Sequence, residues 1–162
     1  MEYVWAGIIF WYLIIFVYKT KTGSPTVPSK DTQIARFLKY VKRGDNVADL
    51  GCGDGRVLFS TAKKGASGEG WEIEPLPYLY AVIRAMRKKN SKIKIHFADM
   101  WKADLSKFDV VFVYQLTRYA PRFVRKCQKE MKRGALVIAN TYPLDGLYLL
   151  KKDGELYVYK IR

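Results

Sequence analysis

The sequence has the length and composition of a single folded domain. Its 162 residues are 49% hydrophobic and 27% charged, which excludes a chain that is disordered over most of its length. The net charge is +14, and Glu2 is the only charged residue before Lys19, so the rest of the chain carries the positive charge and favours an anionic partner. The two cysteines, Cys52 and Cys127, are too few for a disulfide scaffold and match no zinc pattern. The one histidine, His96, argues against a histidine-based triad or metal site, and we expect no metal.

The first segment, residues 3–18, is apolar and carries no charge. As a helix rising about 1.5 Å per residue it would span roughly 24 Å, slightly less than a hydrocarbon core of about 30 Å. Its apolar side chains occupy every face, which argues against a core helix, and no basic residues precede it as they would in a cleaved signal peptide. We therefore expect an N-terminal transmembrane helix and assign residues 1–21 to a membrane anchor.

Basic residues after this segment predict its orientation. Lys19, Lys21 and Lys30 place the downstream chain on the cytoplasmic side of a single-pass membrane protein. The N-terminus lacks the arginine-rich, acid-poor composition of a mitochondrial presequence, which favours a prokaryotic plasma membrane. The scattered lysines and arginines of the body are then expected to face an anionic lipid surface.

The body of the chain, residues 46–162, alternates strand and helix patterns after a leading segment at 22–45. This leading segment begins as a linker rich in glycine, proline, serine and threonine, and the spacing of Ile34, Phe37 and Val41 predicts a helix after it. Strands are expected at 46–50, 68–74, 92–98, 109–114 and 135–140, helices at 56–64, 76–86 and 120–131, and a hairpin at 147–161. The helix at 76–86 has one apolar face, made of Leu76, Leu79, Tyr80, Ile83 and Met86. The sequence therefore predicts an α/β fold, with a mostly parallel seven-stranded sheet, helices on both faces and a C-terminal antiparallel hairpin.

A glycine-rich loop, DLGCGDG at residues 49–55, follows the first expected strand. Its glycines let backbone N–H groups approach a ligand, and ligands of such sheets bind beyond the carboxyl ends of the strands. The loop has GxGxG spacing rather than the GxGxxG of a dinucleotide fingerprint, and any tight strand-to-helix turn also favours glycine.

Two further acids end the next two strands. Glu72 can accept hydrogen bonds from ribose hydroxyls, and Asp99 can accept one from an adenine amine while Met100 and Trp101 pack on the ring. Each acid taken alone is equally well explained as a helix cap or a solvated loop residue. Together with Asp49, they place three acids at consecutive strand ends, which favours a nucleoside site.

These residues resemble the class I S-adenosylmethionine-dependent methyltransferases, and the resemblance covers residues 31–162. It implies a Rossmann-like methyltransferase sheet, with S-adenosyl-L-methionine as cofactor and S-adenosyl-L-homocysteine as product. It further implies that Asp49 holds the methionine amino end, Glu72 the ribose and Asp99 the adenine. The cofactor-binding residues expected on this basis are Asp49, Gly51, Cys52, Gly53, Glu72, Ile73, Asp99, Met100, Trp101 and Tyr114.

Nearly the whole chain resembles a narrower group, the membrane-anchored protein-lysine methyltransferases related to the ATP synthase c-subunit lysine N-methyltransferase. The resemblance rests on the apolar first segment and on TVPS, DLGCGDGR, WEIEP, ADMWKADLSKFDVVFVY and YPLDGLYLL. It implies that TVPS, residues 26–29, folds over the cofactor site and that the substrate is a membrane protein with an accessible lysine. The chain has QLTRYAP where this family commonly has a leucine- and proline-rich stretch, so the exact acceptor stays open.

Methyl transfer to a lysine needs alignment, exclusion of water and a deprotonated amine rather than a nucleophilic side chain. The catalytic candidates follow the fourth strand and are Tyr114, Gln115 and Thr117. Candidate walls of the acceptor channel are Trp101, Tyr119 and Tyr142. Two alternatives remain: an RNA, lipid or small-molecule methyltransferase, although no NPPY-type motif is present, and a membrane-tethered cofactor-binding protein without turnover.

Overall fold

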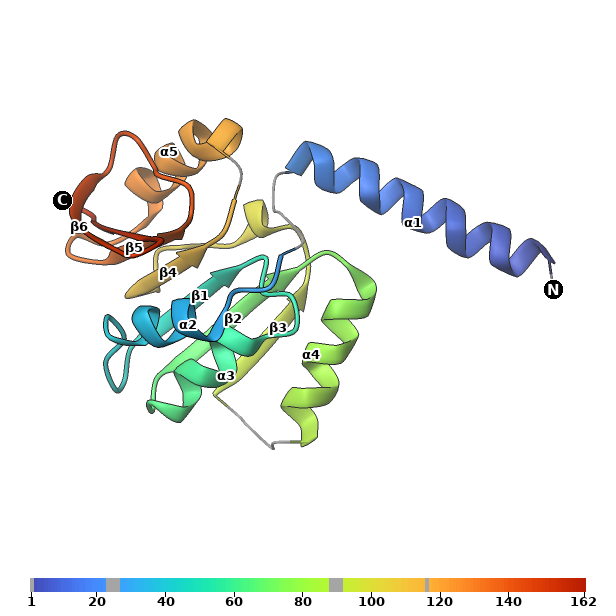
Figure 1. Cartoon of the computed structure of the whole chain (residues 1–162), viewed down its shortest axis with the longest axis horizontal. Coiled ribbons are helices and arrows are strands. Elements are labelled where there is room, and N and C mark those ends of the chain that lie inside the picture. Colours follow the sequence, from blue (N-terminus) through green and yellow to red (C-terminus); the bar gives the residue numbers. More distant parts are fainter. Residues whose placement is uncertain (1, 23–26, 88–91, 116) are drawn as a thin grey trace.

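The computed structural model describes residues 2–22, 27–87, 92–115 and 117–162 (Figure 1). Its helices are α1 (Glu2–Thr22), α2 (Asp31–Leu38), α3 (Arg56–Lys63), α4 (Pro75–Arg87) and α5 (Ala120–Glu130), with short 3-10 turns η1 (Met100–Lys102) and η2 (Thr117–Tyr119). Its strands are β1 (Asn46–Leu50), β2 (Ser67–Glu72), β3 (Ile93–Phe97), β4 (Val110–Val113), β5 (Leu136–Asn140), β6 (Tyr148–Asp153) and β7 (Leu156–Lys160).

The strands form one seven-stranded mixed sheet in the order β3-β2-β1-β4-β5-β7-β6. Strands β1 to β5 are parallel, and β7 pairs antiparallel with both β5 and β6. The predicted α/β sheet with a C-terminal antiparallel hairpin is confirmed. The chain runs outward from β1 to β3 and then returns to β4 on the other side of β1, so a crevice opens between β1 and β4 at their carboxyl ends.

The two faces of the sheet have separate hydrophobic cores, because alternate residues of a strand point to opposite faces. In the fully buried strand β4, Val110 and Phe112 pack with α2 and α3, whereas Val111 and Val113 pack with α5. Helix α2 belongs to the first of these cores, since Phe37 is fully buried and its ring centroid lies 4.8 Å from that of Phe112. The leading helix therefore packs against the sheet rather than standing apart from the body.

Helix α4 packs on the sheet through its small residues. Ala81 is fully buried and Ala85 packs on the core formed by α3 and β3. The large apolar residues predicted for one face of this helix all lie on its outer side and are exposed, namely Leu76, Leu79, Tyr80, Ile83 and Met86. An amphipathic helix ordinarily turns such a face toward the core, so α4 is inverted in this respect.

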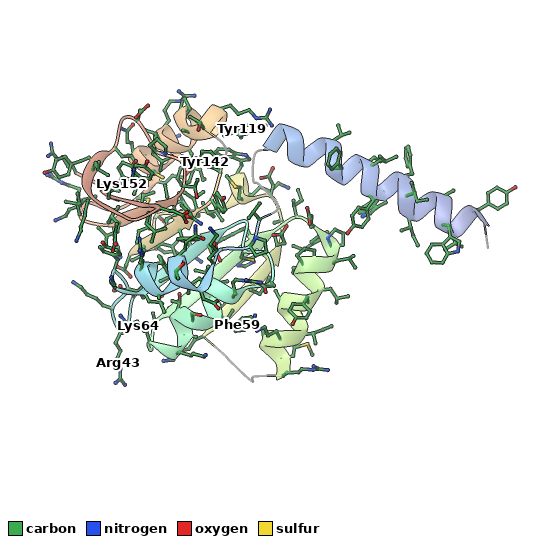
Figure 2. The ribbon with its side chains drawn as sticks, viewed as in Figure 1. Arg43, Phe59, Lys64, Tyr119, Tyr142 and Lys152 are labelled. Atoms are coloured by element: carbon green, nitrogen blue, oxygen red, sulfur yellow. The ribbon has the colours of Figure 1, made fainter. Side chains whose placement is uncertain are left out.

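Helix α1 contains the apolar first segment and projects outward from the sheet (Figures 1 and 2). The large apolar side chains that the structure describes on this helix are exposed, from 43% for Tyr12 to 92% for Tyr3. Within the described residues, no helix has the length and apolar character needed to cross a membrane.

Candidate functional site

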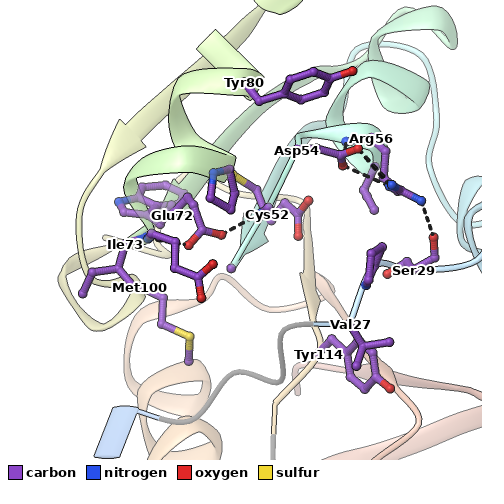
Figure 3. Close-up of a pocket in the computed structure, with 18 of the residues that line it drawn as sticks. Val27, Ser29, Cys52, Asp54, Arg56, Glu72, Ile73, Tyr80, Met100 and Tyr114 are labelled. Atoms are coloured by element: carbon purple, nitrogen blue, oxygen red, sulfur yellow. Dashed lines mark hydrogen bonds and ion pairs between the residues drawn. The ribbon is translucent and has the colours of Figure 1, made fainter. Parts of the chain in front are cut away.

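A cavity of about 550 Å³ opens where β1, β2 and β4 end, in the crevice that the sheet order creates (Figure 3). It is lined by Tyr12, Val27, Pro28, Ser29, Asp49, Gly51, Cys52, Gly53, Asp54, Arg56, Val57, Trp71, Glu72, Ile73, Glu74, Leu76, Pro77, Tyr80, Ala98, Asp99, Met100, Phe112 and Tyr114. The structure thus brings together every residue that the sequence assigned to cofactor binding except Trp101.

The glycine loop forms the floor of this cavity. The backbone N–H groups of Gly51 and Cys52 both donate to the carbonyl oxygen of Trp71, at 2.9 and 3.0 Å, and so join the ends of β1 and β2. Gly55 adopts a left-handed φ of 74°, and a Cβ there would lie 2.9 Å from the ring of Phe59. Both the turn and the close approach of α3 therefore require glycine at position 55.

The Glu72 carboxylate is fixed by backbone hydrogen bonds. It accepts from the N–H of Gly53 through Oε2, and from the N–H groups of Ile73 and Glu74 through Oε1, each at 2.8 Å (Figure 3). The side chain is only 6% exposed, and these three donors compensate for its burial. Its orientation is thus set before any ligand arrives, and each oxygen keeps lone pairs that can accept from a diol.

Asp49 is a buried acid whose charge is poorly compensated. It is 3% exposed, and its Oδ2 atom has no hydrogen-bond partner among the described residues. Burial, and then the negative charges of Glu72 and Asp54, raise the pKa of Asp49 from 3.8 to about 8. Burying the ionised carboxylate of Asp49 is unfavourable, and a cation or hydrogen-bond donor placed at Oδ2 would offset much of this free-energy cost. The cavity therefore favours a ligand with a positive group.

Asp99 lies at the adjoining edge of the cavity, where it caps η1. Its Oδ1 accepts from the N–H of Trp101 at 3.0 Å, and Met100 lines the same wall. The Trp101 ring turns away, with the Arg122 guanidinium 4.0 Å from its centroid and the ring centroid of Phe123 at 6.5 Å. The structure therefore places Asp99 and Met100 in the cavity and leaves Trp101 outside it.

The three catalytic candidates are in different environments. Tyr114 lines the cavity, and its ring centroid lies 6.0 Å from that of Tyr142. Gln115 is buried, with neither its Oε1 nor its Nε2 bonded to a described residue, whereas Thr117 is exposed on η2. Tyr119, a candidate wall, lies half-buried beside Arg118, whose guanidinium is 4.8 Å from the ring centroid.

The segment before α2 covers one side of the cavity. Val27, Pro28 and Ser29 line it, while Thr26, the first residue of TVPS, lies outside the described residues. Arg56 holds this segment in place by donating from Nη1 to the Ser29 carbonyl oxygen at 3.4 Å and from Nε to Asp54 Oδ1 at 3.0 Å (Figure 3).

Asp54 and Arg56 were not among the residues predicted for the site. Burial alone would raise the pKa of Asp54, but the hydrogen bonds from Arg56 outweigh it and lower this pKa. Asp54 lies inside the glycine loop and Arg56 directly follows it, and this position in the sequence is the signal that could have identified them.

A buried polar network ties the same segment to β5. Asn140 is fully buried, and its Nδ2 donates to Gln33 Oε1 at 3.2 Å and to Ser29 Oγ at 3.5 Å. Thr141, which follows, has a φ of 67°, and the N–H of Tyr142 donates back to the Asn140 carbonyl oxygen at 2.8 Å. This is a γ-turn, a strained geometry for a β-branched residue, and it sets the position of Tyr142 next to Tyr114.

Comparison with known proteins agrees with this geometry. A family model described as the ANTKMT methyltransferase domain matches residues 49–150, from the acid of the glycine loop to strand β6. The chain belongs to this family. The ATP synthase c-subunit lysine N-methyltransferase of Xenopus laevis is 32% identical over 121 residues, which are 74% of this chain and 54% of that protein. A protein-lysine N-methyltransferase of Saccharolobus islandicus is 31% identical over 130 residues, 75% of this chain and 79% of that protein.

A solved structure is similar over most of the methyltransferase fold. It is an RNA methyltransferase from Salinibacter ruber in complex with S-adenosyl-L-homocysteine, with 26% sequence identity and a TM-score of 0.78, covering 83% of this chain and 94% of that chain. The chain spans about half the length of the vertebrate c-subunit methyltransferases that it matches, 54% of the Xenopus protein and 54% of the human one.

Proposed function

We propose that this chain is an S-adenosyl-L-methionine-dependent protein-lysine N-methyltransferase. The observation that carries the proposal is the buried Asp49 carboxylate at the floor of the cavity, which has one oxygen without a partner in the described parts of the chain and lies beside the pre-set Glu72. The cofactor carries an ammonium group and a sulfonium, and such charges satisfy a carboxylate of this kind. Membership of the methyltransferase family supports the same function, as do relatives that are protein-lysine methyltransferases, such as those of Xenopus laevis and Saccharolobus islandicus.

The residues of the cavity fit this cofactor from end to end. Asp49 would hold the ammonium, Glu72 the two ribose hydroxyls and Asp99 the exocyclic amine of the adenine, with Met100 against the ring. When bound, the cofactor supplies an electrophilic methyl group. The structural relative from Salinibacter ruber, which holds S-adenosyl-L-homocysteine, supports a ligand of this class.

The remaining task of the chain is to align the acceptor amine and keep water away from it. Tyr114 and Tyr142 would form an aromatic entrance, and such a surface favours the neutral amine because it solvates an ammonium poorly. Gln115 is buried next to Tyr114 in the sequence but does not line the cavity, so no contact with the amine is assigned to it. Thr117, exposed on η2, would contact the acceptor outside the cavity.

The acceptor would be a lysine of a membrane protein, and α1 would hold the enzyme at the same membrane. This rests on the exposed apolar side chains of α1, because a surface of this kind is stable only when lipid or protein covers it. Lys19, Lys21 and Lys30 would keep the catalytic body on the cytoplasmic side of a prokaryotic membrane, close to anionic lipid headgroups.

A labelling experiment tests the activity. The detergent-solubilised chain is incubated with methyl-labelled S-adenosyl-L-methionine, membranes and lysate, and the label is separated among protein, RNA and lipid. Label recovered as methyl-lysine in a membrane protein is the expected result. RNA is the second candidate, since the Salinibacter relative is an RNA methyltransferase and the chain carries +14, and label confined to RNA would replace the lysine assignment.

Substitution of Glu72 tests the cofactor site separately. Glu72→Ala removes the acceptors for two ribose hydroxyls, so we expect a loss of cofactor affinity of about 100-fold or more, measured by calorimetry. Glu69→Ala is the matched control, because Glu69 is an acid on the same strand that does not line the cavity. Its Oε1 pairs with Lys107 Nζ at 2.7 Å. Equal effects of the two substitutions would contradict the ribose assignment.

A further inference from the structure

The outer side of α4 is an unusual surface for a helix of an α/β domain. Five large side chains spaced at three and four residues form one stripe that faces solvent, with exposed fractions from 42% for Ile83 to 72% for Met86. We call this set the α4 stripe; it consists of Leu76, Leu79, Tyr80, Ile83 and Met86. An apolar patch of this regularity marks a contact site rather than incidental exposure.

Packing inside the body does not need the stripe. The inner side of α4 already contacts the sheet through Ala81 and Ala85, and Arg84 lies over the Phe59 ring at 4.7 Å and reaches Asp54 Oδ2 at 3.7 Å. The large residues are therefore not displaced core residues. All five side chains are exposed, and two of them, Leu76 and Tyr80, also line the cavity.

The charges around the stripe indicate what covers it. Helix α4 contains no acid, its exposed C-terminal residue is Arg87, and the sequence continues with Lys88 and Lys89. An apolar stripe bordered by cations is the pattern of a helix that lies in the interface of an anionic bilayer.

The stripe is continuous with α1 around the mouth of the cavity. Tyr12 of α1 and Leu76 and Tyr80 of α4 line the same opening. In Figure 1 both helices lie to the right of the sheet, with α1 above α4.

We propose that the α4 stripe docks on the surface of an anionic lipid bilayer, so that α1 and α4 together turn the mouth of the cavity toward the membrane. The proposal rests on the membrane attachment of α1 proposed above and adds a second contact, which fixes orientation. One contact with the membrane leaves the rotation of the body about that contact undefined, whereas two contacts hold the opening at the headgroup level. The acceptor lysine would then be one that lies close to the membrane surface.

Environment-sensitive fluorescence in the full chain tests the two contacts separately. Single cysteines are introduced by Ile83→Cys on the stripe, Leu13→Cys on α1 and Ser106→Cys on an exposed turn of the body, and each is labelled with nitrobenzoxadiazole. The native Cys52 and Cys127 are buried, and the unsubstituted chain measures any background labelling. The proteins are reconstituted in phosphatidylcholine vesicles with or without phosphatidylglycerol, and spin-labelled lipids serve as quenchers.

We expect the probe at position 83 to shift to the blue and to be quenched by spin labels near the headgroups, more strongly with phosphatidylglycerol, while the probe at 106 stays aqueous. A water-like probe at 83 together with a quenched probe at 13 would overturn docking by α4 and leave the α1 attachment standing. A water-like probe at both positions would overturn both proposals. A blue shift at 83 that lipid spin labels do not quench would assign the stripe to a contact with protein, such as a second copy of this chain, and overturn the lipid proposal.

Discussion

Cofactor affinity should rise steeply with pH, because binding requires the ionised form of Asp49. Burial and the neighbouring carboxylates raise the pKa of this group to about 8 in the free protein, and it is therefore mostly protonated at neutral pH. A bound ammonium next to Oδ2 favours the carboxylate and lowers its pKa. Binding must then release a proton from Asp49 whenever the pH is below about 8.

The size of the effect follows from the fraction of protein that is ionised. One pH unit below its pKa, only about a tenth of Asp49 is ionised, and the apparent dissociation constant is about tenfold higher than its limiting value, or about 1.4 kcal/mol. Two units below, the penalty is about 100-fold, so affinity should change about tenfold between pH 6 and pH 7. Above the pKa of about 8 the dependence on Asp49 should disappear.

Calorimetric titration with S-adenosyl-L-homocysteine measures both the pH dependence of the affinity and the release of protons on binding. The dissociation constant gives the slope, and repetition in buffers of different ionisation enthalpy gives the number of protons released. Asp49→Asn is the control, since it keeps the shape of the side chain but removes the titrating group. This variant should bind the ligand more weakly, and its dissociation constant should no longer show the pH dependence attributed to Asp49. An unchanged slope in Asp49→Asn, or constant wild-type affinity from pH 6 to pH 8, would show that Asp49 does not control binding in this way.

The raised pKa of Asp49 also predicts how the stability of the folded protein depends on pH, and Asp49→Asn tests this dependence. The pKa of Asp49 is higher in the folded chain than its ordinary 3.8, so between pH 4 and pH 8 the folded state binds more protons than the unfolded state. The stability of the free wild-type protein should therefore fall as pH rises through this window, and Asp49→Asn should reduce that fall. Chemical denaturation without ligand measures it, and a wild-type stability that rises in this range would contradict the assignment.

Three substitutions test the packing around the site. Gly70→Ala should destabilise the fold by about 1–3 kcal/mol, because its Cβ would lie 2.6 Å from Cys52 Sγ; unchanged urea denaturation would contradict this. Asn140→Ala should cost about 1–3 kcal/mol by leaving Gln33 Oε1 with one donor fewer, and should raise the KM for the cofactor by loosening the cavity wall. A stability loss with unchanged KM would limit Asn140 to the core. Thr141→Gly should stabilise by about 1 kcal/mol by relieving the positive φ, and a lower thermal midpoint would show that the turn is unstrained.

The order of helices and strands could be predicted because it depends on neighbouring residues. The apolar run of β4 and the spacing of Phe123, Val124 and Cys127 in α5 each determine an element locally, and both match the structure. The acids at positions 49, 72 and 99 could be placed together from the sequence because parallel strands end at the same edge of a sheet.

The predictions were weaker wherever a side chain had a choice of neighbours. Trp101, which follows β3, was predicted to lie in the cofactor site. Its ring instead packs on Arg122 and Phe123 of α5, because a large ring gains more from that packing than from facing the cavity. The apolar face of α4 was recognised, but its outward orientation was not. The spacing of a helix reveals that a face exists and says nothing of which face meets the sheet.

Short stretches of chain encode the α/β class, the glycine loop, the acids at the strand ends and the resemblance to lysine methyltransferases, so all four could be recognised before any coordinates. Folding was needed to show that Ser29 meets Asn140 across 111 residues of sequence and that Gln115 is buried without a described partner. Folding also sets how far the pKa of Asp49 moves, since that depends on burial and on Glu72 and Asp54. Burial, long-range contact and electrostatic coupling are properties of groups that folding brings together, and no local pattern contains them.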